Sequence, residues 1–256
     1  MYIRRFLLSV TVALIGLSPL SALASSSGAE HIPDLKWSFD GPFGTYDRAS
    51  LQRGLQVYRQ VCSACHALEH RSYRNLADLG YSEAQIKTIA AEYTVTDGPN
   101  DDGEMFDRPA RPSDVFKAPF ANEKQARASN NGAYPPDLSL ITKARIGGAN
   151  YVYGVLTGYA DAPEGVTLQP GQYYNKTMNG HILAMAPPLV EGAIAYEDGS
   201  PTTVDQYARD VAHFLTWAAE PEMEQRKRMG VKVFLFLAVF AGIMYATKRQ
   251  IWSDQH

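Results

Sequence analysis

Two cysteines and a histidine stand together in the run Cys62-Ser63-Ala64-Cys65-His66, and these are the only cysteines in the chain. A C-x-x-C-H run is the attachment signature of c-type haem, in which both thiols bond to the porphyrin and the histidine becomes an iron ligand. The two-residue gap places both sulfurs along one edge of the macrocycle. The run therefore predicts one covalently attached haem c, with His66 as an axial ligand.

Two other chemistries use a C-x-x-C pair, namely a thioredoxin-like redox couple and half of a zinc site. A redox couple does not need the histidine and normally lies in a βαβ context, which this sequence lacks. A zinc site needs two more ligands, and His70 is the only nearby candidate. Haem attachment explains the motif better than either alternative.

The ligand opposite His66 decides what the iron does, because an open position permits ligand or oxygen chemistry, whereas a thioether favours electron transfer. Met185 is the favoured candidate. The small residues on either side of it let the backbone approach a flat ring, and Pro187 and Pro188 limit the entropy cost of presenting the sulfur. Filling a core gap is the usual role of a methionine. The other candidates by residue type are Met105, Met178, His31, His70, His181 and His213.

Buried haem propionates need a hydrogen-bond donor. Arg127 precedes a loop, residues 129–136, whose Asn, Gly and Pro content suits a segment wrapped around the haem edge. Most arginines are surface residues, so a surface role is the alternative.

The first 24 residues have the three parts of a secretory signal peptide: a basic start, an apolar run and Ala22-Leu23-Ala24 as a cleavage site. Pro19 and the short apolar run argue against an uncleaved anchor. Export agrees with c-type haem attachment, which takes place outside the cytoplasm.

A second apolar stretch, residues 229–247, spans roughly 28 Å as a helix, close to the thickness of a bilayer's hydrocarbon core. Basic residues flank both sides, so the positive-inside rule does not orient it. The signal peptide does: it places the domain of residues 25–221 and the connector 222–228 outside the cytoplasm, and the tail 248–256 inside. A buried core helix is the alternative.

Six acids and no base lie between residues 92 and 107, in a chain whose formal net charge is −3. A solvated loop is the default interpretation. The functional alternative is a surface that steers a basic partner, with an association rate that falls as salt rises. The six are Glu92, Asp97, Asp101, Asp102, Glu104 and Asp107.

Apolar spacing and capping residues predict an all-α domain with long loops. The strongest patterns are a helix capped by Asp47 that leads to the cysteines, and an amphipathic helix from Val204 that stops before Pro221. Residues 158–188 read as loop with short extended pieces. Further helices are expected at 82–93, 122–129, 137–145 and 149–157, with capping boxes at Ser82/Gln85 and Asn122/Gln125.

With these residues in place, the chain resembles the cytochrome c1 family, the membrane-anchored c-type subunits of the cytochrome bc1 complex, in an alphaproteobacterial form. The resemblance covers nearly all of the expected mature chain. Its most specific pieces are residues 53–58 (RGLQVY), 126–139 (ARASNNGAYPPDLS), 185–188 (MAPP) and 226–230 (RKRMG).

The resemblance implies a class I cytochrome c core with insertions, in which the N-terminal and C-terminal helices cross. Gly54 matches the small residue at that crossing, and Tyr58 matches the aromatic residue packed there. The family's methionine ligand falls on Met185 and its propionate-pairing arginine on Arg127. Some bacterial members brace the methionine side with a disulfide, and this chain has no cysteines for one, so the loop must depend on its prolines and on packing.

The implied function is a one-electron relay from the Rieske iron–sulfur subunit to a soluble or membrane-tethered cytochrome c, in a complex with cytochrome b that oxidises quinol. The chain itself would have no catalytic site of its own. One alternative is an anchored monohaem cytochrome that feeds a terminal oxidase. Another is a haem enzyme or gas sensor with an open distal site, and a purely structural subunit would require haem-free cysteines.

Overall fold

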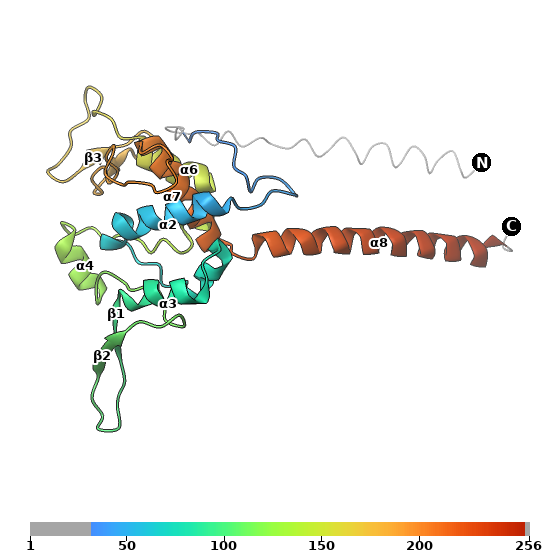
Figure 1. Cartoon of the computed structure of the whole chain (residues 1–256). Coiled ribbons are helices and arrows are strands. Elements are labelled where there is room, and N and C mark those ends of the chain that lie inside the picture. The colour runs from blue at the N-terminus through green and yellow to red at the C-terminus, as the bar shows by residue number, and fades with distance from the viewer. Residues whose placement is uncertain (1–31, 254–256) are drawn as a thin grey trace, which may run out of the picture.

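Helix α2 (Arg48–Gln60) and helix α7 (Val204–Ala219) cross at the centre of the domain in the computed structural model, which describes residues 32–253 (Figure 1). A Cβ atom on Gly54 would lie 2.1 Å from the carbonyl oxygen of Asp210 and 2.6 Å from the Cβ of Phe214. Only glycine permits this approach. The Tyr58 ring packs on Phe214 at 5.7 Å between centroids, so the expected roles of Gly54 and Tyr58 are confirmed.

Shorter elements cover both sides of this crossing. Helix α6 (Gly148–Thr157) and the one-turn α5 (Ile141–Ala144) pack against α7, whereas the 3₁₀ helix η2 (Tyr73–Leu79) and α3 (Glu83–Ala91) lie together beside α2. The core is apolar and aromatic. Its largest fully buried side chains are Trp217, Tyr58, Tyr73, Tyr207 and Phe214.

The predicted N-cap residues of three helices are confirmed, but one expected hydrogen bond goes to a different residue. Asp47 accepts a hydrogen bond from the Ala49 N–H (3.1 Å) at the start of α2, and Ser82 and Gln85 form the reciprocal capping box of α3. Asn122 caps α4 (Glu123–Ser129) through the Gln125 N–H. The Gln125 side chain, however, accepts from the Ala121 N–H rather than from Asn122, so this second box is displaced by one residue.

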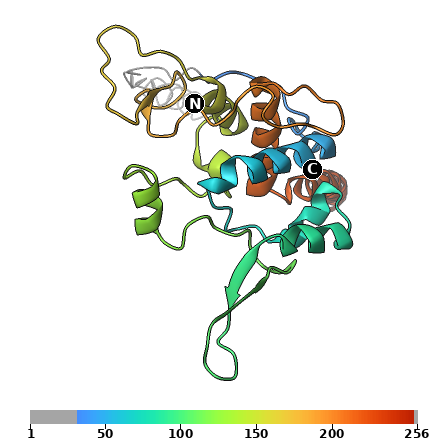
Figure 2. The same ribbon diagram turned by 60° about the vertical axis from the view of Figure 1, so that its left-hand side comes forward.

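The fold is mostly helical, as predicted, but the part of the chain that the structure describes also contains two small antiparallel sheets. Strands β1 (Thr94–Asp97) and β2 (Phe106–Pro109) pair from Thr94↔Pro109 to Asp97↔Phe106 and project from the domain as a hairpin (Figures 1 and 2). This hairpin carries most of the acidic stretch, which was expected to be loop. Strands β3 (Tyr173–Tyr174) and β4 (Ile182–Leu183) form the second sheet, within the segment where extended pieces were expected.

The expected helix at 137–145 is wrong in its first half. The Asp137 carboxylate accepts hydrogen bonds from the backbone N–H groups of Glu69 and Ser139, and the Leu138 N–H donates to the Ala67 carbonyl. The Asp137 carboxylate and the Leu138 N–H thus bind the segment after His66, and this part of the chain does not form a helix. Only α5 remains helical.

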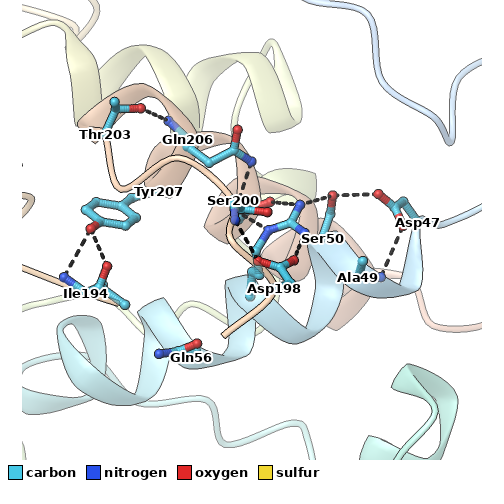
Figure 3. A network of polar contacts seen from close by, with 12 residues as sticks. Asp47, Ala49, Ser50, Gln56, Ile194, Asp198, Ser200, Thr203, Gln206 and Tyr207 are labelled. Atoms are coloured by element: carbon cyan, nitrogen blue, oxygen red, sulfur yellow. Dashed lines mark hydrogen bonds and ion pairs between the residues drawn. The ribbon is translucent and has the colours of Figure 1, made fainter. Parts of the chain in front are cut away.

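A polar network fixes the segment that follows the Met185 loop (Figure 3). The Tyr207 hydroxyl donates to the Ile194 carbonyl and accepts from the Ile194 N–H. The Gln56 side chain donates to the Ala195 carbonyl at 2.9 Å, and the Asp198 carboxylate accepts from the Ser200 N–H. Residues 194–200 are thereby held against both crossing helices.

Helix α8 (Met223–Ile251) projects alone from the domain (Figure 1). Its most apolar 18-residue window has a mean hydropathy of 2.0, and none of that window is buried within the chain. Within residues 32–253 it is the one helix that is long and apolar enough to cross a membrane, and it is the C-terminal membrane-spanning helix. The predicted connector, 222–228, is mostly the first turns of the same helix. The predicted signal peptide (1–24), His31 and residues 254–256 of the predicted tail lie outside the described residues.

Candidate haem site

Cys62 begins a 3₁₀ turn, η1 (Cys62–Ala64), one residue after α2, and Cys65 is the C-cap of that turn. The N–H groups of Cys65 (3.1 Å) and His66 (2.9 Å) both donate to the Cys62 carbonyl, which draws the three site residues into one tight turn. Cys62 is half-buried, Cys65 is exposed, and both thiols are free. Two thiols and an imidazole are thus presented on one short, ordered segment.

His66 has the hydrogen-bond partner that an iron-ligating imidazole requires. Its Nδ1 atom lies 2.7 Å from the carbonyl oxygen of Pro136. A carbonyl only accepts, so Nδ1 carries the proton and Nε2 keeps a free lone pair for a metal. Burial lowers the pKa of His66, which further favours the neutral ring. The Tyr58 hydroxyl donates to the His66 carbonyl at 3.1 Å and fixes the backbone.

The loop that supplies Pro136 is fastened to the chain after His66. The Ala67 carbonyl accepts from the Leu138 N–H at 2.9 Å, and the Ser139 hydroxyl oxygen accepts from the His70 N–H at 3.0 Å. The sequence quoted Pro135-Pro136 as part of a loop at the haem edge, but a backbone acceptor leaves no signal in the residue type. The role of the Pro136 carbonyl could not have been predicted.

Met185 lies near the two cysteines and His66. It is half-buried in a loop of mostly exposed residues, and the hydroxyl of Tyr159 donates to its backbone carbonyl at 3.0 Å. The competing methionines are placed differently. The Met178 sulfur accepts a hydrogen bond from the Tyr151 hydroxyl at 3.2 Å, and Met105 is 60% exposed in the turn of the β1–β2 hairpin.

The described histidines other than His66 have local partners or are exposed. His213 is buried among Trp37, Phe39 and Tyr46, and its Nε2 accepts from the Asp47 N–H at 3.2 Å. This is a core histidine. His181 has Nδ1 at 3.1 Å from the Asn175 carbonyl oxygen, and His70 is exposed.

Arg127 contacts the same loop that receives His66. Its Nη1 donates to the Gly132 carbonyl at 3.0 Å, and its guanidinium lies 5.5 Å from the ring centroid of Tyr134. Its side chain is 48% exposed and pairs with Glu123 at 2.7 Å. With Asn122, Glu123 and Lys124 it lines an open cavity of about 640 Å³. A charged donor therefore stands at the edge of the loop.

The six acids of the 92–107 stretch do not form one free cluster. Glu92 pairs with Arg59, and Asp97 pairs with Arg108. Asp107 accepts from the Thr96 hydroxyl at 2.8 Å. Within residues 32–253, three of the six have side chains without a hydrogen bond or ion pair, all exposed at the hairpin turn. They are Asp101, Asp102 and Glu104.

These residues fit a covalently attached haem. Two free thiols, an imidazole with its Nε2 lone pair available and a nearby thioether are the donor set of a His/Met c-type haem. The crossing of α2 and α7 positions the thiols and the imidazole. Together with α8, the fold and the site define a membrane-anchored monohaem c-type cytochrome.

The chain belongs to the cytochrome c1 family, whose model matches residues 37–255. It is 49% identical to "Cytochrome b/c1" of Bradyrhizobium diazoefficiens, where the match covers 97% of this chain and 40% of that protein. It is 49% identical to "Cytochrome c1 1, heme protein, mitochondrial" of Arabidopsis thaliana, over 97% of this chain and 82% of that protein. It is 42% identical to "Cytochrome b-c1 complex catalytic subunit, mitochondrial" of Candida albicans, over 91% of this chain and 81% of that protein.

Proposed function

We propose that this chain is the electron-transferring subunit of a quinol–cytochrome c oxidoreductase. It takes one electron at a time from the Rieske iron–sulfur subunit and passes it to a soluble or membrane-tethered cytochrome c. Cytochrome b is its second partner in the complex. The observation that carries the proposal is the His66–Pro136 hydrogen bond beside two free thiols, in a chain of the cytochrome c1 family.

Each site residue has a defined task in this proposal. Cys62 and Cys65 would form the thioether bonds to the porphyrin, His66 would bind the iron through Nε2, Met185 would supply a thioether ligand, and Arg127 would pair with a propionate. The bound haem c supplies a one-electron iron couple whose potential the thioether ligand raises. Quinol oxidation belongs to the other subunits, so this chain needs no acid–base side chain of its own.

The turn of the β1–β2 hairpin is our candidate for the docking of the acceptor. Asp101, Asp102 and Glu104 are the three acids of the stretch, within residues 32–253, whose carboxylates have neither an ion pair nor a hydrogen bond. Exposed, unpaired carboxylates on a projecting hairpin set up a field that steers a basic partner. Glu92 and Asp97 contribute less to steering, because Arg59 and Arg108 balance their charges. Asp107 keeps its charge, since its partner is the neutral Thr96 hydroxyl, but it lies in β2 rather than in the turn.

The predicted topology completes the proposal. Residues 1–24 are removed as a signal peptide, residues 25–221 form the haem domain in the periplasm, and 229–247 cross the inner membrane. The end of the chain, 248–256, is then cytoplasmic. The unpaired apolar surface of α8 supports the span.

Purification of the native complex tests the proposal. We expect a C-terminal tag to co-purify this chain with b-type haem and an iron–sulfur subunit, and the preparation to reduce cytochrome c with quinol in an inhibitor-sensitive reaction. A lone c haem without quinol activity, in detergent and again in native nanodiscs, would instead favour an oxidase-linked cytochrome.

A further inference from the structure

The segment that presents Met185 has little to hold it in place. On its N-terminal side β4 pairs with β3 over only two residues, and on its C-terminal side Leu189 is the first buried residue. Both cysteines of the chain belong to the haem motif, so no disulfide braces the segment. A neutral thioether is a weak ligand, and its occupancy depends on how well the loop is preorganised.

The Tyr159 hydroxyl supplies a brace at this point. It donates to the carbonyl of Met185 at 3.0 Å and lies 3.4 Å from the carbonyl of Ala186. These are the ligand itself and its neighbour. Tyr159 is half-buried, so solvent competes only partly for the hydroxyl.

Tyr159 is itself held by the end of α6. It forms an antiparallel bridge with Asn175, and the Lys176 N–H donates to the Gly158 carbonyl at 2.9 Å. Asn175 is fully buried, and its side-chain Nδ2 donates to the Val155 carbonyl at 2.8 Å. Since α6 packs on α7, a continuous set of contacts runs from the core to the Met185 backbone.

We propose that Tyr159 is a positioning residue for the Met185 ligand. Its hydroxyl restrains the loop that carries Met185, which no disulfide does in this chain. The inference rests on the proposed function, because it assumes a haem ligated by Met185. One hydrogen bond of this kind shifts a local equilibrium by about fivefold. Loss of the hydroxyl should therefore raise the fraction of time that the sulfur is off the iron by about that factor.

The test replaces Tyr159 by phenylalanine in the haem-loaded full-length chain and measures carbon monoxide binding to the reduced protein and the midpoint potential. We expect Tyr159→Phe to bind carbon monoxide about fivefold faster and to have a lower midpoint potential. Tyr151→Phe is the matched control, since it removes the hydroxyl that donates to Met178, and it should change neither. A Tyr159→Phe protein that matches wild type in both readouts would overturn the inference.

The Met185→Leu variant distinguishes a failure of the Tyr159 proposal from a failure of the proposed function. If Met185→Leu gains carbon monoxide binding and Tyr159→Phe does not, the ligand assignment stands and only the brace is wrong. If wild type already binds carbon monoxide readily, Met185 is not a tight ligand and both proposals fail.

A second, independent observation concerns Phe43, which is 80% exposed in an ordered turn before α2. Gly41 has a φ of 68°, and a Cβ on Gly44 would lie 2.1 Å from the Asp40 carbonyl oxygen, so both glycines are required by the backbone. The Thr45 N–H donates to the Ser38 carbonyl and closes the turn at 3.0 Å. The chain thus holds an aromatic side chain in solvent on a rigid loop.

Helix α8 fixes the height of this loop relative to the membrane. Lys227 Nζ donates to the carbonyls of Phe39 (2.6 Å) and Gly44 (3.1 Å), on either side of the turn. Lys227 stands two residues before the apolar run that begins at Met229, about 3 Å along the helix axis. The polar headgroup layer is roughly 5–7 Å thick on each side of a bilayer. The loop lies beside the start of α8 (Figure 1), and a span that begins at Met229 would bring it within reach of the headgroup layer.

We infer that Phe43 inserts into the lipid interface and gives the haem domain a second contact with the membrane. Phenylalanine is among the apolar residues that interfacial segments bury at the boundary between headgroups and acyl chains, and the two Lys227 hydrogen bonds hold the loop to the start of α8.

Site-directed spin labelling of the complex in nanodiscs tests this contact. With the haem cysteines bound as thioethers, a nitroxide can attach to this chain only at an introduced cysteine, and the complex without that cysteine gives the labelling background of the other subunits. We expect Phe43→Cys to give a label accessible to oxygen and protected from a water-soluble nickel complex. Ile146→Cys is the control, because Ile146 is 88% exposed on the domain, and its label should be open to nickel. Nickel access at position 43, or immobilisation with protection from both agents by a protein partner, would overturn the inference.

Discussion

Arg53 and Asp210 join the two crossing helices through a bidentate ion pair. Arg53 Nε and Nη2 donate to the two carboxylate oxygens of Asp210 at 2.9 and 3.0 Å, next to the Gly54 contact. Arg53 Nη1 also donates to Asp198 at 2.7 Å. Since Asp210 is only 1% exposed, the pair ties α2, α7 and the segment after Met185 together in a water-poor environment.

Loss of the Asp210 charge should destabilise the domain, because the Arg53 guanidinium would keep its burial but lose its main partner. We expect Asp210→Asn to lower the free energy of unfolding by about 2–4 kcal/mol, measured by urea titration followed by Soret circular dichroism. Glu83→Gln is the control. It breaks the exposed Lys87–Glu83 pair and should lower the free energy of unfolding much less than Asp210→Asn does, because solvent screens a surface pair. Equal, small effects would show that the buried pair contributes no more than a surface one.

Replacement of Met185 by leucine should open one axial position while leaving covalent attachment intact. We expect the reduced Met185→Leu protein to bind carbon monoxide and the midpoint potential to fall, because the thioether that stabilises ferrous iron is gone. Spectroscopy with and without carbon monoxide is the measurement. Met178→Leu serves as the control and should resemble wild type. The reverse result would move the ligand assignment to Met178.

Neutralisation of the hairpin turn should slow encounter with a basic acceptor. We expect the triple variant Asp101→Asn, Asp102→Asn, Glu104→Gln to lower the association rate about tenfold at low ionic strength, with the difference vanishing at high salt. Stopped-flow oxidation of the haem by cytochrome c at several salt concentrations measures it. A control with the same change in net charge elsewhere (Asp161→Asn, Glu164→Gln, Glu197→Gln) should have a much smaller effect. An equal effect would place docking away from the hairpin.

His213 should make the domain acid-sensitive. Burial lowers its pKa from 6.5 to about 4, against the opposing influence of Asp47 and Asp210, while Arg53 and Arg48 lower it further. A depressed histidine pKa means that the unfolded chain binds the proton first. Stability from this group is therefore complete above pH 6.5 and is lost as the pH falls toward 4, by up to about 3 kcal/mol.

Urea titrations between pH 6.5 and 4 would show the effect as a slope of the free energy of unfolding against pH. His213→Gln keeps an acceptor for the Asp47 N–H but cannot titrate, so its stability should change less between pH 6.5 and 4. His70→Gln, at an exposed position, should retain the wild-type slope. Parallel slopes for His213→Gln and wild type would show that other groups cause the acid sensitivity.

Local chemistry explains which features could be predicted from the sequence. Asp47 and Ser82 cap helices by binding N–H groups two or three residues further along the chain, so short sequence patterns predict their roles. The haem motif is equally local. The α2–α7 crossing was expected only through the family resemblance, because the contact of Gly54 with Asp210 joins residues far apart in the chain.

The features that were missed depend on long-range partners. Asp137 looked like the start of a helix, but its carboxylate binds the Glu69 N–H. The acidic stretch became a hairpin because Arg108, just beyond it, pairs with both Asp97 and Asp114. Tyr159 is one of 15 tyrosines, and nothing in its neighbours marks the one whose hydroxyl reaches Met185.

By the proposed function, electrons pass through this chain on their way from quinol to cytochrome c. Rapid mixing of the purified complex with quinol and oxidised cytochrome c, while the c-type and acceptor absorption bands are followed separately, tests it most directly. We predict that the haem bound at Cys62 and Cys65 is reduced before the acceptor, at a rate at least equal to turnover, and that a quinol-site inhibitor abolishes both steps. Reduction of the acceptor while this haem stays oxidised would contradict the account.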